Sequence, residues 1–183
     1  MASGEIWADE IVDEKLWLGA GRDAENLPQL RAHGITHILN VADDVPNFHE
    51  AEPDLTYLCL NVADFGGGSR HAYPAAVEFV RDAWAGTGGG RVLVHCANGS
   101  NRSATVTIAV CMKLLGLTLA ESWALVCERR KAAAPLADNR AVSIPLPLGS
   151  MAEVARDSTS DRARVRFHFV HTTNVLTGDV GRI

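Results

Sequence analysis

The chain has 183 residues, of which 47% are hydrophobic and 21% are charged, and its formal net charge is −5 at pH 7. This length suits one domain with a buried core, and no apolar run approaches the roughly 20 residues of a membrane-spanning helix. The acidic balance excludes a general attraction to nucleic acid or to anionic lipid, so we expect neither a nucleic-acid partner nor a membrane partner.

The N-terminal segment and the cysteines indicate the compartment. The opening segment, MASGEIWADEIVDE, is acidic and lacks the basic and apolar stretches of a secretory signal. The cysteines have no C-x-x-C spacing and lie in or beside apolar segments, as reduced thiols commonly do: Cys59, Cys96, Cys111 and Cys127. We therefore expect a cytoplasmic or nuclear protein.

The first part of the chain predicts three strand regions and one helix. Residues 11–20 hold two apolar segments around a turn-like Asp-Glu pair, which predicts a strand or a small hairpin. Residues 24–34, which follow Asp23, predict a short helix that ends at a glycine. Residues 35–42 and 55–64 are apolar and rich in β-branched side chains, so they predict buried strands.

The next part predicts three helices and one strand. Residues 73–84 and 103–115 repeat apolar side chains at helical spacing, and residues 91–96 form an apolar strand between them. A T-x-x-E capping box opens a further helix over residues 118–134. The order of elements predicts an α/β domain with a central, mainly parallel sheet of about five strands and helices on both faces.

The pattern changes near residue 149. Residues 149–183 are polar and without periodicity, except that residues 165–170 alternate as a strand does. Such a short segment cannot bury a core of its own. We predict one domain over residues 1–148 and a tail that is flexible or docked on the domain, with a partner-binding segment as the remaining alternative.

Residues 92–106, VLVHCANGSNRSATV, place a thiol between a predicted strand and a predicted helix. A short loop at this position can curl so that its backbone N–H groups point at one centre, in line with the positive end of the helix. An arginine at the start of the helix can hold two phosphate oxygens. The candidate phosphate-binding residues are therefore Ala97, Asn98, Gly99, Ser100, Asn101 and Arg102.

The same positive field would favour the ionised form of the Cys96 thiol, which is the nucleophilic form. Ser103 is placed to donate a hydrogen bond to that sulfur and to help it leave in a later step. The alternative, a buried structural cysteine beside an unrelated arginine, requires that three residues fit the loop by coincidence. We expect no metal site at His95 and Cys96, because adjacent ligands without a second pair rarely complete a tetrahedral site.

The segment HCANGSNRS resembles the H-C-x5-R-S/T signature of the cysteine-dependent protein phosphatases. Residues 10–140 resemble their dual-specificity subgroup, through LWLGAGRDAENLPQLRAHGITHILNVA and SATVTIAVCMKLLGLTLAESWALVCERR. The resemblance implies that Cys96 attacks phosphorus, that an aspartic acid protonates the leaving oxygen, and that water then hydrolyses the phosphocysteine. It implies no cofactor and no metal.

In this family the general acid lies roughly thirty residues before the cysteine, on a separate loop. Asp64 fits this position, since it precedes Cys96 by 32 residues and follows a predicted strand. Parallel strands would open both loops at one edge of the sheet. Three other aspartates, in the preceding loop, are alternative acids: Asp43, Asp44 and Asp54.

The resemblance has departures that leave the substrate open. The family usually has Ala and Ser where this chain has Asn98 and Asn101, and an Asn at the second position is similar to the RNA 5′-phosphatase branch. The resemblance implies a phosphatase of phosphorylated proteins, acting on phosphotyrosine and phosphoserine/threonine. An RNA 5′-phosphatase and a phosphoprotein-binding pseudophosphatase are the alternatives. A sulfur-transfer enzyme is disfavoured, because it would not need Asp64.

Cys59 is interpreted as a core residue or as the partner of Cys96 in a protective disulfide.

Overall fold

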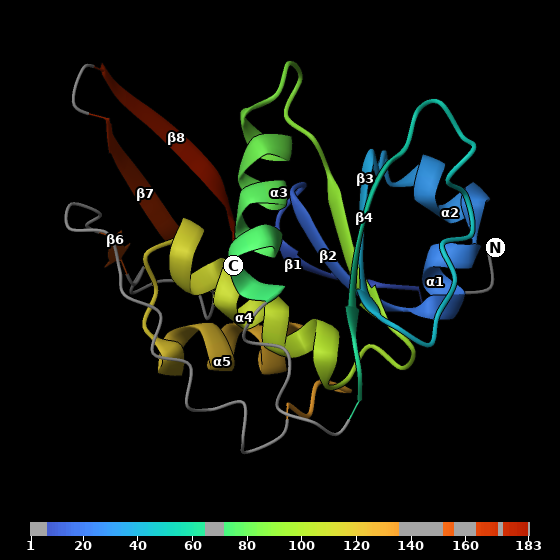
Figure 1. The fold of residues 1–183 in the computed structure, drawn as a ribbon. Coiled ribbons are helices and arrows are strands. Elements are labelled where there is room, and N and C mark those ends of the chain that lie inside the picture. The colour runs from blue at the N-terminus through green and yellow to red at the C-terminus, as the bar shows by residue number, and fades with distance from the viewer. Residues whose placement is uncertain (1–6, 65–71, 136–151, 156–163, 172–173, 183) are drawn as a thin grey trace, which may run out of the picture.

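The computed structural model describes residues 7–64 and 72–135 in full, and the backbone of three strands within residues 152–182 (Figure 1). Residues 1–6, 65–71, 136–151, 156–163, 172–173 and 183 lie outside the described part. In chain order the elements are β1 (Asp9–Val12), β2 (Leu16–Ala20), α1 (Gly21–Glu25), α2 (Leu27–Ala32), β3 (His37–Ala42), β4 (Thr56–Val62), α3 (Tyr73–Ala85), β5 (Val92–Cys96), α4 (Arg102–Leu114), α5 (Leu119–Arg129), β6 (Ala152–Ala155), β7 (Arg164–His171) and β8 (Asn174–Arg182).

The main sheet has five strands in the order β1-β2-β5-β3-β4. Only β1 runs antiparallel to its neighbour, and the other pairs are parallel. Helices α3, α4 and α5 cover one face of the sheet, and α1 and α2 cover the other (Figure 1). The predicted α/β class, a mainly parallel sheet of about five strands with helices on both faces, is therefore confirmed.

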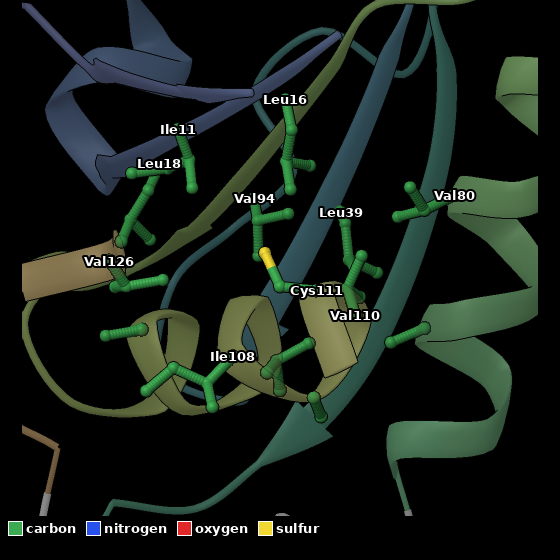
Figure 2. Close-up of a cluster of buried hydrophobic side chains, with 14 of the residues drawn as sticks. Ile11, Leu16, Leu18, Leu39, Val80, Val94, Ile108, Val110, Cys111 and Val126 are labelled. Atoms are coloured by element: carbon green, nitrogen blue, oxygen red, sulfur yellow. The ribbon is translucent and has the colours of Figure 1, made fainter. Parts of the chain in front are cut away.

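Two apolar clusters hold the helices on the sheet. The larger one lies between the sheet and α3, α4 and α5, and Figure 2 shows side chains of β2, β3 and β5 meeting those of α4. Residues at alternate strand positions, such as Leu16 and Leu18, enter this cluster, while Trp17 enters the second cluster beside α1 and α2. Cys111 is fully buried in the larger cluster, and this burial raises the pKa of its thiol to about 12.

The predicted helix over residues 24–34 is in fact two short helices, α1 and α2. Asp23 lies inside α1, where its carboxylate accepts a hydrogen bond from the Ala20 N–H at 2.7 Å. Asn26 then caps α2 by accepting a hydrogen bond from the Gln29 N–H at 3.2 Å. Helix α1 therefore begins directly at the end of β2, next to the end of β5.

The helix predicted over residues 118–134 is shorter than expected. Its start is confirmed, because Thr118 and Glu121 form the capping box, with the Thr118 N–H donating to the Glu121 carboxylate at 2.8 Å. It ends at Arg129, since Arg130 adopts an extended conformation with φ −117° and ψ 100°. Residues 130–135 then run beside the loop that follows Cys96, where the Ala134 N–H donates to the Ser100 carbonyl at 2.8 Å.

The C-terminal segment contains a second sheet, of three antiparallel strands in the order β6-β7-β8. Strand β7 includes the strand predicted over residues 165–170, whereas β6 and β8 were not predicted. Backbone pairing with β7 does not require the alternation of side chains that a half-buried strand shows. The domain boundary near residue 149 and the nature of the tail remain predictions.

No helix within the described residues is long and apolar enough to cross a membrane.

Candidate active site

The candidate site lies at one edge of the main sheet, where three parallel strands end. Cys96 is the last residue of β5, and α4 begins six residues later at Arg102. Asp43 and Asp44 directly follow β3, and Asp64 follows β4. Because these strands are parallel neighbours, their carboxyl ends open on the same side of the sheet.

The sulfur of Cys96 is buried and has two hydrogen-bond partners. The side chain of Ser103 is fully buried, and its Oγ lies 3.1 Å from the Cys96 Sγ. The Gly99 N–H donates to the same sulfur at 3.3 Å. The Cys96 sulfur therefore lies within hydrogen-bonding distance of one hydroxyl and one backbone N–H group.

Position 99 of the loop accepts only glycine. Its φ is +67°, in the left-handed region that residues with a side chain rarely adopt. A Cβ at this position would overlap the Arg130 guanidinium and would lie 2.5 Å from the Gly19 carbonyl oxygen. The loop therefore packs directly against the end of β2, without an intervening side chain.

Four consecutive carbonyl groups of the loop are held away from the sulfur by hydrogen bonds. The Ala97 carbonyl accepts from the Gly21 N–H at 3.1 Å, and the Ser100 carbonyl accepts from the Ala134 N–H. The carbonyls of Asn98 and Gly99 both accept from the Arg130 guanidinium, at 3.5 Å and 2.6 Å. These donors come from two separate segments of the chain, the start of α1 and residues 130–135.

The orientation of these carbonyls fixes the orientation of the amides. In a trans peptide the C=O of one residue and the N–H of the next point in opposite directions. The N–H groups of residues 98–101 therefore point away from the outer donors, and the Gly99 N–H does reach the Cys96 sulfur. The loop therefore directs backbone N–H groups toward its inner side, an arrangement that can bind an anion.

Arg130 is the residue of this site that the sequence did not indicate. Its side chain is buried, and besides the two loop carbonyls it donates to the Leu18 carbonyl at 3.2 Å and to the Asp9 carboxylate at 2.7 Å. It follows another arginine, Arg129, at the end of a helix. No local spacing distinguishes the two, so only the three-dimensional contacts reveal the difference.

The guanidinium of Arg102 is 3% exposed and faces carboxylates. Asp44 binds it at two points, with Nη1 donating to Oδ1 at 2.6 Å and Nη2 donating to Oδ2 at 3.3 Å. The Val62 carbonyl accepts a further bond from Nη1 at 3.1 Å. Burial lowers the pKa of Arg102, but the hydrogen bond to Asp44 and the nearby negative charges outweigh it, so the net pKa is raised. The bond to Arg102 in turn lowers the pKa of Asp44.

Asp64 reaches the same site from β4. Its Oδ1 accepts a hydrogen bond from the Asn101 Nδ2 at 3.0 Å, and its Oδ2 lies 3.7 Å from the Arg102 Nη2. A β-bulge precedes it, because the pairing shifts by one residue and Asn61 adopts φ +49°. Bulges redirect the residues that follow them. Asn101, one of the departures from the family pattern, thus contacts the candidate acid.

The alternative acids proposed from the sequence differ in their distance from the site. Asp43 is at the site, with its Oδ1 3.5 Å from the Arg102 Nη1. Asp54 is not, because it pairs with Arg31 on the surface at 3.3 Å. The structure thus brings Cys96, Ser103, the loop, Arg102 and Asp64 together, as the sequence predicted, and it removes one of the alternative acids.

The structure does not favour a disulfide between Cys59 and Cys96. Asn40 of β3 pairs with His95 on one side and with Cys59 on the other, so a full strand separates the two cysteines. Two strand spacings amount to roughly 9.5 Å, whereas disulfides need Cα atoms within about 7 Å. Each of the four cysteines is a free thiol.

His95, the residue before the candidate nucleophile, is fully buried. Neither ring nitrogen has a hydrogen-bond partner among the described residues. Burial lowers the pKa of His95 to about 4, so the ring is neutral at pH 7. Its strand neighbour is Gly19, which leaves room for the imidazole on the sheet.

Comparison with known proteins agrees with this geometry. The family model described as the dual specificity phosphatase catalytic domain matches residues 16–139. The chain belongs to this family. The match covers the main sheet except β1, the candidate loop and both helices after it.

Individual relatives have related descriptions. Human dual specificity protein phosphatase 9 is 38% identical over 121 residues, which cover 66% of this chain and 31% of that protein. The solved structure of human DUSP28 is 26% identical with a TM-score of 0.63, covering 76% of this chain and 91% of that one. The structure of a human tyrosine phosphatase-like serine/threonine/tyrosine-interacting protein is 34% identical with a TM-score of 0.63, covering 74% and 92%. The chain spans about 30% of the length of several curated relatives that it matches.

Proposed function

We propose that this chain is a cysteine-dependent dual-specificity protein phosphatase, which hydrolyses phosphotyrosine and phosphoserine/threonine through a phosphocysteine intermediate. The observation that carries the proposal is the loop around Cys96. Its carbonyls accept hydrogen bonds from donors outside the loop, and the Gly99 N–H donates to the buried Cys96 sulfur. Family membership and the names of the relatives support the same assignment.

In the first step a phosphoryl group binds in the loop. The backbone N–H groups of residues 98–101 and the Arg102 guanidinium bind its non-bridging oxygens and stabilise the charge that develops on them. The Cys96 thiolate attacks phosphorus, so that an S–P bond forms as the ester O–P bond breaks. Asp64 donates its proton to the leaving oxygen, which departs as the alcohol or phenol of the substrate.

In the second step water hydrolyses the intermediate. Asp64, now a carboxylate, takes a proton from water as the water oxygen attacks phosphorus. The S–P bond breaks and inorganic phosphate forms. Cys96 leaves as a thiolate, which the Ser103 hydroxyl and the Gly99 N–H stabilise at the distances seen in the structure.

The environment of the protein belongs to the same proposal. We place it in the cytoplasm or nucleus, because a reactive thiolate and four free cysteines suit a reducing compartment. A phosphorylated protein is the proposed partner. The acidic net charge supports neither a nucleic-acid substrate nor a membrane substrate.

A pseudophosphatase is the second candidate, and one observation favours it. The Arg102 guanidinium already carries two hydrogen bonds to Asp44, and Asp43 and Asp64 lie beside it. Three carboxylates around the phosphate-binding arginine oppose the approach of a dianion. In that case the loop would hold a phosphoryl group too weakly for turnover, and the domain would be a phosphoprotein-binding pseudophosphatase.

A substrate panel tests the proposal. The full chain is incubated with an aryl phosphate, phosphotyrosine and phosphothreonine peptides, a phosphoinositide and an RNA 5′-triphosphate, with Cys96→Ser as the blank. We expect hydrolysis of the aryl phosphate and of both peptides, all lost in Cys96→Ser. Turnover of the RNA alone would establish the RNA 5′-phosphatase instead. Absence of all turnover by a folded protein would indicate the pseudophosphatase.

A further inference from the structure

The N–H groups of Arg102 can be accounted for one by one. Nη1 donates to Asp44 at 2.6 Å and to the Val62 carbonyl at 3.1 Å, and Asp43 is a longer third acceptor of the same nitrogen at 3.5 Å. Nη2 uses one hydrogen for the other oxygen of Asp44. Nε is buried and has no partner among the described residues. The second Nη2 hydrogen has only the 3.7 Å contact with Asp64, which is beyond hydrogen-bonding distance.

The two available hydrogens lie on one edge of the guanidinium. The N–H bonds of Nε and Nη2 are parallel on that edge, and such a pair matches two oxygens of a phosphate. A buried donor without a partner is unfavourable, so the free Nε indicates that a ligand oxygen normally fills this place. Asp44 occupies the opposite end of the same group. The carboxylate and a phosphate can therefore bind Arg102 at the same time.

We propose that Asp44 is a positioning residue, which holds the Arg102 guanidinium by its terminal nitrogens and keeps the Nε and Nη2 edge free for phosphate. The inference rests on the proposed function, because it assigns a role within the same site. It adds a carboxylate that does not itself contact the substrate. Its effect is to fix a long side chain before the ligand arrives, so that less side-chain entropy is lost on binding.

Asp44 also has a second effect with the opposite sign. Its negative charge lies near the bound dianion and repels it, so removal of the charge alone would tighten anion binding. Asp43, one residue earlier, carries the same charge but reaches Arg102 only at 3.5 Å. The change in anion affinity on neutralising Asp43 therefore measures the effect of charge alone. Any additional loss of affinity on neutralising Asp44 measures its positioning of Arg102.

The test compares Asp44→Asn with Asp43→Asn in the full chain. Tungstate, an oxyanion without a hydrolysable bond, is titrated by calorimetry, and aryl phosphate hydrolysis is measured in parallel. We expect Asp44→Asn to raise the tungstate dissociation constant about tenfold, as expected for loss of one charge-assisted contact. Asp43→Asn should change it less than about twofold or tighten it. Asp44→Glu, which retains the carboxylate, should recover part of the loss.

Each outcome decides one question. Tighter tungstate binding by Asp44→Asn, or equal values for the two Asn variants, would overturn the positioning role and indicate that Asp44 competes with the ligand. Because the Asp44 side chain is 57% exposed, the variant should keep the wild-type thermal transition. If the wild-type chain binds tungstate but hydrolyses nothing, the proposed function fails while the binding comparison still decides the role of Asp44.

Discussion

Arg130 and Gly99 are joined by a hydrogen bond of 2.6 Å from the Nε of one to the carbonyl of the other, across 31 residues of sequence. The same guanidinium also reaches the Asn98 carbonyl, so one side chain fixes two peptide units of the loop. The orientation of the loop amides, the proposed phosphate-binding groups, thus depends on a residue that lies beyond α5. A distant segment therefore completes a site whose other parts lie close together in the sequence.

We predict that Arg130→Met lowers kcat/KM for an aryl phosphate by about 10²-fold, since removal of one preorganised backbone donor has an effect of this order. Arg130→Met should also destabilise the fold, because the Asp9 carboxylate loses its 2.7 Å partner. Arg129→Met is the matched control, since Arg129 is adjacent but pairs with Asp13 at a surface that is partly exposed. Kinetics and thermal unfolding of both variants provide the measurement. Equal losses in kcat/KM would contradict a specific role of Arg130.

A second prediction concerns Asp64, the proposed acid. Asp64→Asn should lower kcat for a phosphoserine peptide by about 10²–10⁴-fold, because an alkoxide leaves poorly without a proton. Nitrophenyl phosphate has a good leaving group, so its hydrolysis should fall by a much smaller factor. Asp54→Asn removes the same charge from the preceding loop, where Asp54 pairs with Arg31, and it should leave both rates unchanged. Equal losses for the two substrates would assign Asp64 a different role.

A third prediction separates the two chemical steps. Ser103→Ala removes the hydroxyl that lies 3.1 Å from the Cys96 sulfur, so the thiolate becomes a poorer leaving group in the second step. We expect kcat to fall about tenfold and the phosphocysteine to accumulate, visible as a burst of nitrophenolate before the steady state. Thr107→Val is the control, because its hydroxyl is buried one turn later in α4 and has no partner among the described residues. A variant with slow turnover but no burst would place the effect in the first step.

The sequence predicted the parts of this site that depend on local spacing. Cys96, Gly99 and Arg102 lie within one loop, and the apolar periodicity on either side predicts the strand and the helix that hold them. Asp64 is indicated by the resemblance to the phosphatase family, and the strand before it has a parallel neighbour that ends at the same edge. The structure brings these residues together, and their catalytic roles remain predictions.

The sequence could not predict the contacts between distant segments. Arg130 and Asp44 matter through hydrogen bonds to the loop and to Arg102, and no periodicity marks either residue. The predicted boundaries of the helices over residues 24–34 and 118–134 were wrong for a related reason. The capping pattern does not show that Asn26 caps a separate helix, nor that Arg130 leaves the helix to bind backbone carbonyls. In each case a tertiary contact outweighs local propensity.

The last prediction concerns stability as a function of pH. Burial lowers the pKa of His95 to about 4 in the folded chain, against an ordinary value of 6.5. Between these values the unfolded chain binds a proton that the folded chain does not, so folding is most stable above about pH 6.5 and weakens as the pH falls. The loss from this one group should reach about 1 kcal/mol near pH 5.5 and about 3 kcal/mol near pH 4.

Chemical denaturation at pH 7.0, 6.0 and 5.5 measures this loss before most carboxylates begin to titrate. In His95→Gln the free energy of unfolding should vary less with pH over this range, whatever its value at pH 7. His49→Gln is the control, because His49 lies on the surface, where its Nε2 contacts the Glu25 carbonyl at 2.8 Å. It should keep the wild-type slope. A wild-type slope in His95→Gln would mean that another group is responsible for the acid sensitivity.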